Sequence, residues 1–413
     1  MKKIRNILLF STLAISLISC TSIKDVNTTK TYSSDDQVYS SQILDVEYAS
    51  QTVTFNELAA KLQTLTVAEI TEGADPVVAI IEATNFTKFA LTYSEEKAAS
   101  RLQAYGIDDL GNFDARYVAC ALDSYLIDKA DFKALVSSNN AISQDLAYNI
   151  TMEVARELGL ARNYIGKISN PDILAKVADA FNELYMYSDG TLDKLGATLV
   201  QEKSSTGFNI KQDGYNANFL PQLTIKYGHC EENHLKQLIS LLNSEDIDAK
   251  IQIEPKTSSY EYLKEWGPFP ETTPEYRVEQ YSDDLALVFA IEYDVMFEFD
   301  TEEGMMKFDS IINEYSKKNG VNQEEGSTVK LLDGAWWQPL YSTSVENIDD
   351  SAYTLIYDNV ATKAGYSIHP YSLVEGSAKL EAEMEALSGL DTVAKPLYVN
   401  NAFYRYITGT SWE

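Results

Sequence analysis

Apolar and polar positions repeat with two different periods along the chain. From Thr54 to about Leu199 the apolar residues recur every three or four positions, which is the spacing of a buried helix face. Beyond about Pro221 they recur at every second position, as in a strand with one buried face. The pattern therefore predicts an α+β protein, with a helical half followed by a half that contains a sheet.

Local signals in the first half mark individual helices. The segment Thr54-Phe55-Asn56-Glu57 has the form of a capping box, so a helix is expected to begin at Phe55. A proline at the first helical position starts another helix at Asn170-Pro171-Asp172. One buried stripe predicts a long helix through Ile142, Leu146, Ile150, Val154, Leu158, Ala161 and Ile165. No steady repeat period links these helices, which indicates an irregular helical bundle.

The second half contains strands that lead into helices. The clearest strand covers 289–299, with apolar residues on one face and acidic residues on the other. Segments 230–236 and 301–307 follow two such strands and are similar to each other at an offset of 71 residues. This repeated order predicts an antiparallel or mixed α+β domain of ferredoxin-like, split βαβ character, with helices on one face. The acidic face is expected to be solvated.

The first residues have the pattern of an export signal. Three basic residues lie within positions 2–5, and an apolar run at 7–18 is too short to span a bilayer. The run ends in Leu17-Ile18-Ser19-Cys20, which resembles the lipobox of bacterial lipoproteins. The resemblance implies cleavage before Cys20, a diacylglycerol on its thiol and acylation of the new N-terminus. Thr21 then implies the outer membrane or the cell surface. The alternative is an ordinary signal peptide with an accidental cysteine.

Composition shifts give the expected organisation. The segment after Cys20 is rich in Ser, Thr, Asp and Asn, and the segment near residue 210 is rich in Gly and Asn. We therefore predict a signal peptide at 1–19, the lipidated cysteine and a flexible tether at 20–44, a helical domain at 45–200, a linker at 201–220 and an α+β domain at 221–413.

The overall charge limits the partners. The 413 residues include 62 acidic and 33 basic side chains, for a net charge of -29. Such a protein is repelled by nucleic acids, so no nucleic-acid partner is expected. The predicted contact with the membrane is made through the N-terminal lipid. Apolar residues at 45% and aromatic residues at 11% are ordinary for a folded protein.

Few residues suggest metal or nucleophilic chemistry. Cys230 and His234 are four residues apart on a predicted helix and could present two ligands to zinc. A third and a fourth ligand are not apparent, so the favoured interpretation is a helix start without metal. Cys120 and Cys230 could pair or remain free. There is no Gly-x-Ser-x-Gly motif and no glycine-rich nucleotide loop. We predict no catalytic residue and no cofactor.

Two groups of residues are candidates for recognition. Glu298 and Asp300 share one face of a strand, as a pair of catalytic carboxylates could. Trp266, Trp336 and Trp337 lie in Gly- and Pro-containing segments and could bind a sugar ring or a protein. The favoured interpretation of these tryptophans is packing under loops. The leading hypothesis is a lipid-anchored binding module for an envelope protein or a glycan. The alternatives are a carboxylate-based hydrolase acting on polysaccharide and a structural or assembly lipoprotein with an apolar patch on the helical half.

Overall fold

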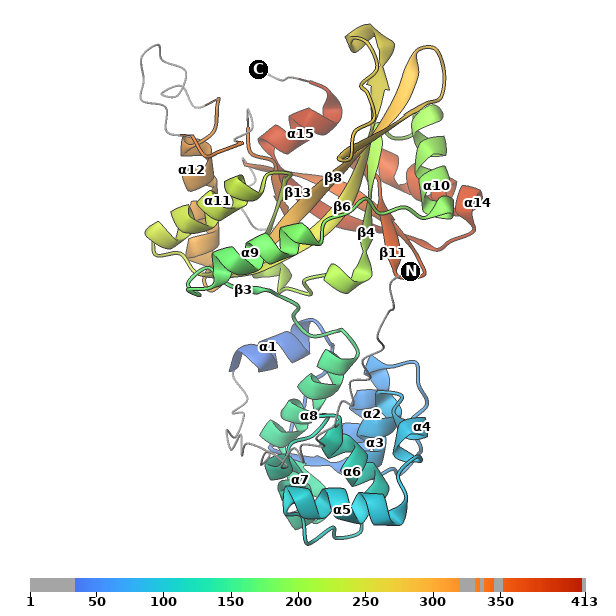
Figure 1. Ribbon diagram of the computed structural model, residues 1–413, viewed down its shortest axis with the longest axis vertical. Helices are drawn as coiled ribbons and strands as arrows, with labels where there is room; N and C mark the ends of the chain where they lie inside the picture. The colour runs from blue at the N-terminus through green and yellow to red at the C-terminus, as the bar shows by residue number, and fades with distance from the viewer. Residues whose placement is uncertain (1–33, 319–330, 335–337, 345–351, 411–413) are drawn as a thin grey trace, which may run out of the picture.

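The chain folds into a helical half and a larger half built around a sheet, stacked one above the other in Figure 1. A computed structural model describes residues 34–318, 331–334, 338–344 and 352–410. In this part of the chain no helix has both the length and the apolar character needed to cross a membrane.

The helical half contains the residues up to about 161. Its elements are α1 (Ser34–Gln42), β1 (Thr52–Thr54), α2 (Phe55–Leu65), α3 (Pro76–Ala83), α4 (Thr87–Ala90), α5 (Glu95–Tyr105), α6 (Ala115–Asp123), α7 (Lys129–Ser137), β2 (Ala141–Ser143) and α8 (Gln144–Glu157). Helix α2 begins at Phe55 as the capping box predicts, because the Thr54 hydroxyl accepts the Glu57 N–H at 3.2 Å. Helix α8 ends at Glu157, so the predicted stripe is helical only through its middle.

Eight antiparallel strands of the second half form a closed barrel. They are β4 (Gly207–Gln212), β5 (Thr224–His229), β6 (Ala249–Leu263), β8 (Leu285–Phe299), β9 (Tyr341–Thr343), β10 (Tyr353–Lys363), β11 (Tyr366–His369) and β13 (Thr392–Asn400). Around the barrel their order is β6-β4-β11-β10-β13-β9-β5-β8, and β8 pairs with β6 along 15 residues to close it. Strands β3 (Gly166–Lys167), β7 (Tyr276–Gln280) and β12 (Tyr371–Ser372) are added to β6, β8 and β10.

The prediction of a ferredoxin-like, split βαβ domain is therefore wrong. The strands alternate as predicted, but the sheet closes instead of staying open with helices on one face. The acidic face of β8 is not solvated either, because Asp294 and Glu298 are 3% and 1% exposed. The same alternation fits a barrel whose polar side chains point inward and whose apolar side chains point outward under helices.

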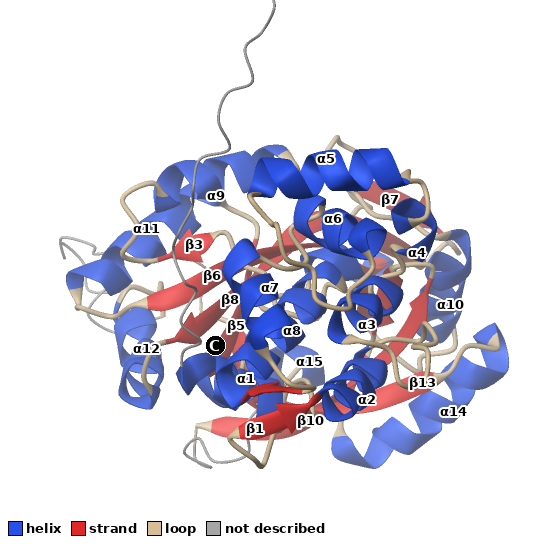
Figure 2. Cartoon of the chain, turned by 90° about the horizontal axis from the view of Figure 1, so that it is seen from below, coloured by secondary structure: helices blue, strands red, loops and turns tan. Residues whose placement is uncertain are grey.

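Helices cover the outside of the barrel on two sides, as Figure 2 shows. Helices α9 (Ile173–Asn182), α11 (Glu232–Ser244) and α12 (Glu302–Glu314) share one apolar core with β5, β6 and β8. Helices α10 (Gly190–Gln201) and α14 (Ser377–Ser388) share a second core with β4 and β11. The predicted helical domain 45–200 thus includes two helices, α9 and α10, whose buried side chains belong to the barrel.

Shorter elements complete the second half. The 3₁₀ turns are η1 (Asp213–Tyr215), η2 (Pro221–Leu223), η3 (Lys264–Trp266) and η4 (Val374–Gly376). The last helix, α15 (Asn401–Thr408), packs Phe403 and Ile407 against Ile356 and Val399 on the inward face of the barrel strands. It therefore covers one end of the barrel.

Candidate functional site

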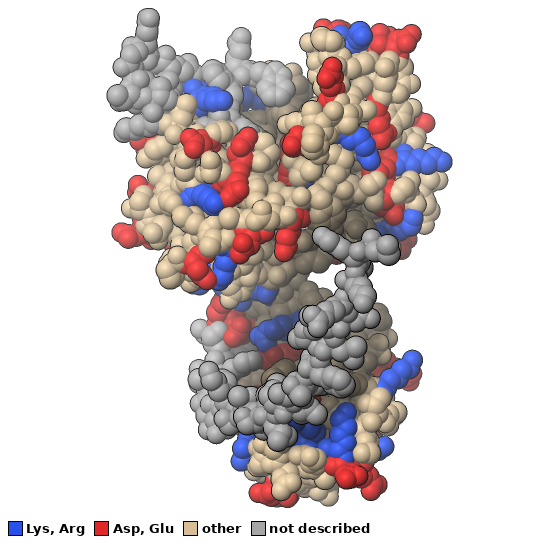
Figure 3. Space-filling view, in the orientation of Figure 1, with Lys and Arg blue, Asp and Glu red and all other residues tan. Residues whose placement is uncertain are grey.

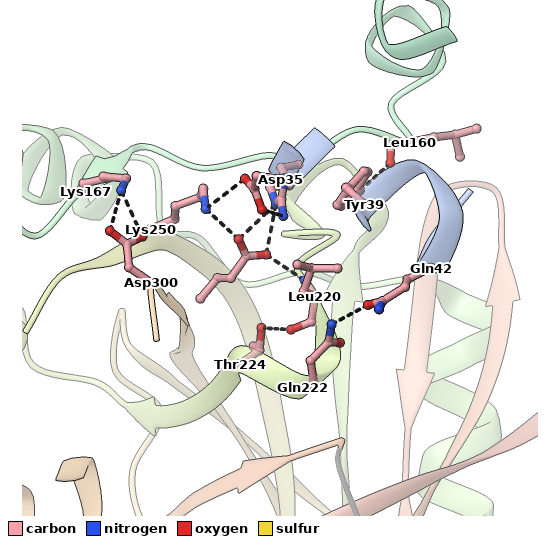
Figure 4. Close-up of polar contacts among 12 residues, drawn as sticks. Asp35, Tyr39, Gln42, Leu160, Lys167, Leu220, Gln222, Thr224, Lys250 and Asp300 are labelled. Carbon is pink, nitrogen blue, oxygen red and sulfur yellow. Dashed lines mark hydrogen bonds and ion pairs between the residues drawn. The ribbon is translucent and has the colours of Figure 1, made fainter. Parts of the chain in front are cut away.

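Glu298, one of the two predicted carboxylates, lies buried where the two halves meet. Its carboxylate accepts hydrogen bonds from Arg162 Nε at 3.0 Å and from the Leu220 backbone N–H at 2.7 Å. Lys250 Nζ lies 2.7 Å from the same carboxylate, and Figure 4 shows Lys250 and Leu220 converging on this point. An acid or base of a hydrolase has to face a space for substrate, whereas Glu298 faces its ion-pair partners.

Asp300 points to a different partner. It is 40% exposed and pairs with Lys167 Nζ at 2.7 Å (Figure 4). Strand β8 ends at Phe299, so Asp300 follows the strand that carries Glu298 and is not part of it. Glu298 is held by Arg162 and Lys250, whereas Asp300 is held by Lys167. The two carboxylates therefore stabilise contacts between segments and are not arranged as a catalytic pair.

The inside of the barrel holds a network of buried charges. Lys211 Nζ lies 3.0 Å from Glu254 and 2.6 Å from Asp294. Lys256 Nζ lies 2.8 Å from Asp294 and 3.7 Å from Glu292. Burial opposes the charge of Asp294, but the two ammonium groups hold its pKa well below the ordinary value. The sequence pattern did not predict this network, because its charges lie on strands β4, β6 and β8, whose pairing joins residues distant in the chain.

A carboxylate–imidazole contact lies beside this network. Asp358 Oδ2 of β10 lies 3.0 Å from His369 Nδ1 of β11. Burial raises the pKa of Asp358 while His369 lowers it, and the balance brings it to about 2. Tyr371 lies beside this pair in sequence, and its ring contacts Phe403 of α15 edge to face at 5.6 Å. The interior is thus filled by groups that bind one another, which makes the barrel a rigid support.

Two of the three histidines form a buried stack outside the barrel. The His229 and His234 rings are parallel, with centroids 3.8 Å apart. The Tyr227 hydroxyl lies 2.8 Å from His234 Nε2, and the backbone oxygens of Asp333 and Gly334 bind the two rings. Burial lowers the pKa of His229 to about 3 and that of His234 to about 4.

The cysteines do not complete a metal site with these histidines. Cys230 is exposed and Cys120 is buried, and both thiols are free. In the described ranges no cluster of three or more His, Cys, Asp and Glu side chains is placed to hold a metal ion. The zinc interpretation of Cys230 and His234 therefore has no support, because His234 already bonds to Tyr227 and Asp333.

Trp266, the third predicted candidate, lies at the tip of a projecting hairpin. We call residues 260–290 the arm: the outer parts of β6 and β8, with η3 and β7 between them, at the upper right of Figure 1. Trp266 is 56% exposed, and its ring contacts Tyr262 edge to face at 5.7 Å. Tyr262 in turn contacts Phe269 at 6.2 Å. Trp336 and Trp337 lie outside the described residues.

Further tyrosines line one face of the arm. On this face Tyr262 and Tyr260 of β6 pair with Ala286 and Val288 of β8. Tyr276 of β7 pairs with Ala290 on the other side of β8. Burial raises the pKa of Tyr260 to about 12, with smaller contributions from Tyr276 and Glu292. These tyrosines were not among the predicted site residues, although Tyr260 and Tyr262 have the spacing of one strand face.

The arm is also strongly acidic. It carries seven Asp and Glu residues and two basic residues, and Figure 3 shows acidic side chains on the projecting part of the molecule. The exposed carboxylates are Glu265, Glu271, Glu275, Asp283 and Asp284. Exposed aromatic rings among charged groups are typical of a contact surface, so the arm is the candidate site. Comparison with family models, with curated proteins and with solved structures finds no match for this chain.

Proposed function

We propose that this chain is a lipid-anchored bacterial envelope protein that acts as a binding module, with the arm as its contact surface. The exposed Trp266 ring carries the proposal. Aromatic side chains give large contact areas and frequently dominate the binding energy of interfaces. Because Tyr262 already holds the ring edge to face, less conformational freedom is lost when a partner binds.

The rest of the molecule suits this role. Strands β6 and β8 continue from the charged interior of the barrel into the arm, so the arm is attached to a rigid base. The resemblance of Leu17-Ile18-Ser19-Cys20 to a lipobox supports anchoring in the envelope. Several acyl chains hold a protein firmly on a membrane, whereas one chain gives marginal binding. The partner is then another envelope component, a protein or a glycan.

Retention of envelope components on the immobilised mature chain tests the contact surface. We expect Trp266→Ala to lower the specific retention of proteins or glycans at least about five-fold, the effect of losing a contact of roughly 1 kcal/mol. The matched control is Tyr125→Asn, since Tyr125 is 84% exposed on the helical half. Its φ of 58° is one that asparagine also adopts readily. Equal retention by both variants would exclude the arm as the contact surface.

Cell fractionation tests the anchor in the same strains. The unaltered protein and Trp266→Ala are expected in the membrane fraction, and Cys20→Ala in the soluble fraction. Cell fractionation then measures anchoring, and retention on the immobilised chain measures binding, independently of each other. If Cys20→Ala stays with the membrane as the unaltered protein does, the lipid on Cys20 is not the anchor.

A further inference from the structure

The basic residues of the arm contact aromatic rings or a carboxylate, whereas its exposed carboxylates form no ion pair with another described residue. Lys264 Nζ lies 4.9 Å from the centroid of the Phe269 ring. The Arg277 guanidinium lies 4.0 Å from the centroid of Phe289 and 3.2 Å from Glu279. No ion pair joins the exposed carboxylates to any other residue that the structure describes; they are Glu265, Glu271, Glu275, Asp283 and Asp284. The arm thus presents net negative charge to a partner.

Aromatic rings lie among these carboxylates. Trp266 directly follows Glu265, and Trp is the side chain whose ring face attracts cations most strongly. The position of Lys264 over Phe269 shows that an ammonium group is accommodated on this aromatic cluster. A surface that combines ring faces with carboxylates therefore has the chemistry that recognises an ammonium or guanidinium group.

From this arrangement, and on the basis of the proposed function, we infer that the arm binds a segment of a partner protein that is rich in lysine or arginine. A neutral glycan would use the ring faces but gain nothing from the carboxylates. An anionic glycan would be repelled by them. The net charge of -29 adds a long-range attraction for a basic segment, and this attraction weakens with salt.

Titration of the full mature chain with hexalysine tests the inference. Fully acetylated hexalysine serves as the uncharged match, and an oligomer of N-acetylglucosamine serves as a neutral glycan. We expect calorimetry to show binding of hexalysine alone, and the affinity to fall when the ionic strength rises from about 0.01 M to about 0.3 M. Trp266→Ala should weaken hexalysine binding about two- to five-fold, and Tyr125→Asn should not change it.

A matched pair of charge variants distinguishes binding at the arm from attraction by the net charge of the whole protein. Asp283→Asn/Asp284→Asn removes two exposed charges of the arm, and Glu95→Gln/Glu96→Gln removes two exposed charges of α5 in the other half. We expect the arm variant to weaken hexalysine binding about three-fold or more, and the α5 variant by much less. Equal losses would overturn the inference, because attraction would then depend on total charge alone.

Titration with the N-acetylglucosamine oligomer distinguishes failure of the inference from failure of the proposed function. Suppose that the N-acetylglucosamine oligomer binds and Trp266→Ala weakens this binding, while hexalysine does not bind. The arm is then a binding surface, and a lysine- or arginine-rich partner segment is excluded. If both Trp266→Ala and the arm charge variant weaken hexalysine binding by the expected factors, the inference is supported. If no probe responds to Trp266→Ala, and envelope retention does not respond either, both proposals fail.

Discussion

At the scale of single residues, the stacked histidines show how strongly burial can restrict a titratable group. His229 and His234 have 0% and 2% of their surface exposed, and their centroids are 3.8 Å apart. A proton on either ring would be buried, and two protons would place like charges in contact. The folded protein therefore keeps both rings neutral at pH values at which an unfolded chain would protonate them.

We predict that the protein loses stability as the pH falls from about 6.5 to about 4. Unfolded histidine has a pKa near 6.5, whereas the folded values are about 3 for His229 and about 4 for His234. In this window the unfolded chain binds protons that the folded chain does not, so acid favours unfolding. Each histidine contributes up to about 1.4 kcal/mol per pH unit. Urea unfolding at a series of pH values measures the slope.

His234→Gln provides the control for this prediction. It removes one titrating ring, so the slope between pH 6.5 and 4 should decrease even if the protein is less stable at pH 7. Asp358 acts in a different window, because its folded pKa of about 2 lies below the ordinary value near 3.8 and matters only in stronger acid. A free energy of unfolding that is constant from pH 6.5 to 4.5 would contradict the prediction.

The sequence located some site residues without showing their surroundings. Trp266 was identified from its Gly/Pro context, and it is exposed. Glu298 and Asp300 were identified from their strand spacing, but their partners Arg162 and Lys167 lie 136 and 133 residues earlier in the chain. Periodicity gives the face on which a side chain lies. It cannot say which distant cation meets it there.

At the scale of elements, the strands were more predictable than the way they join. The alternation over 289–299 corresponds to β8, and α11 and α12 follow strands at the two similar segments. Closure of the barrel requires the three-residue strand β9, which links β13 to β5. A strand of three residues is too short for alternation to identify it. The open sheet was predicted because nothing in the sequence marks that link.

The packing of α10 on the barrel leads to a prediction at this scale. A methyl group at Gly196 would lie 2.4 Å from the Phe208 ring of β4, which is closer than atoms can pack. Gly196→Ala should therefore destabilise the protein by about 1–3 kcal/mol, although alanine favours helix. Gly190→Ala in the same helix has nothing within 4 Å of the added atom and should be neutral or stabilising. Urea unfolding of both variants checks this, and equal stabilities would contradict it.

At the scale of the whole molecule, α1 connects the two halves. Its Tyr39 is buried in the core of the helical half, and the Tyr39 hydroxyl donates to the Leu160 carbonyl at 2.8 Å. Its Asp35 pairs with Arg162 at 3.0 Å, and the Arg162 guanidinium lies 4.4 Å from the centroid of Tyr39. Arg162 also binds Glu298 of β8. Attachment of α1 and the contact between halves therefore depend on the same guanidinium group.

Glu298→Ala should weaken this connection far more than Asp300→Ala does. Removing Glu298 leaves Arg162 and Lys250 without their buried carboxylate, which should lower the free energy of unfolding by about 3–5 kcal/mol. Asp300 pairs with Lys167 near the surface, and its loss should cost about 1 kcal/mol or less. Hydrogen exchange should also show the amides of α1 exchanging at least about ten-fold faster in Glu298→Ala alone. If both variants exchange alike at α1, Glu298 does not couple the two halves.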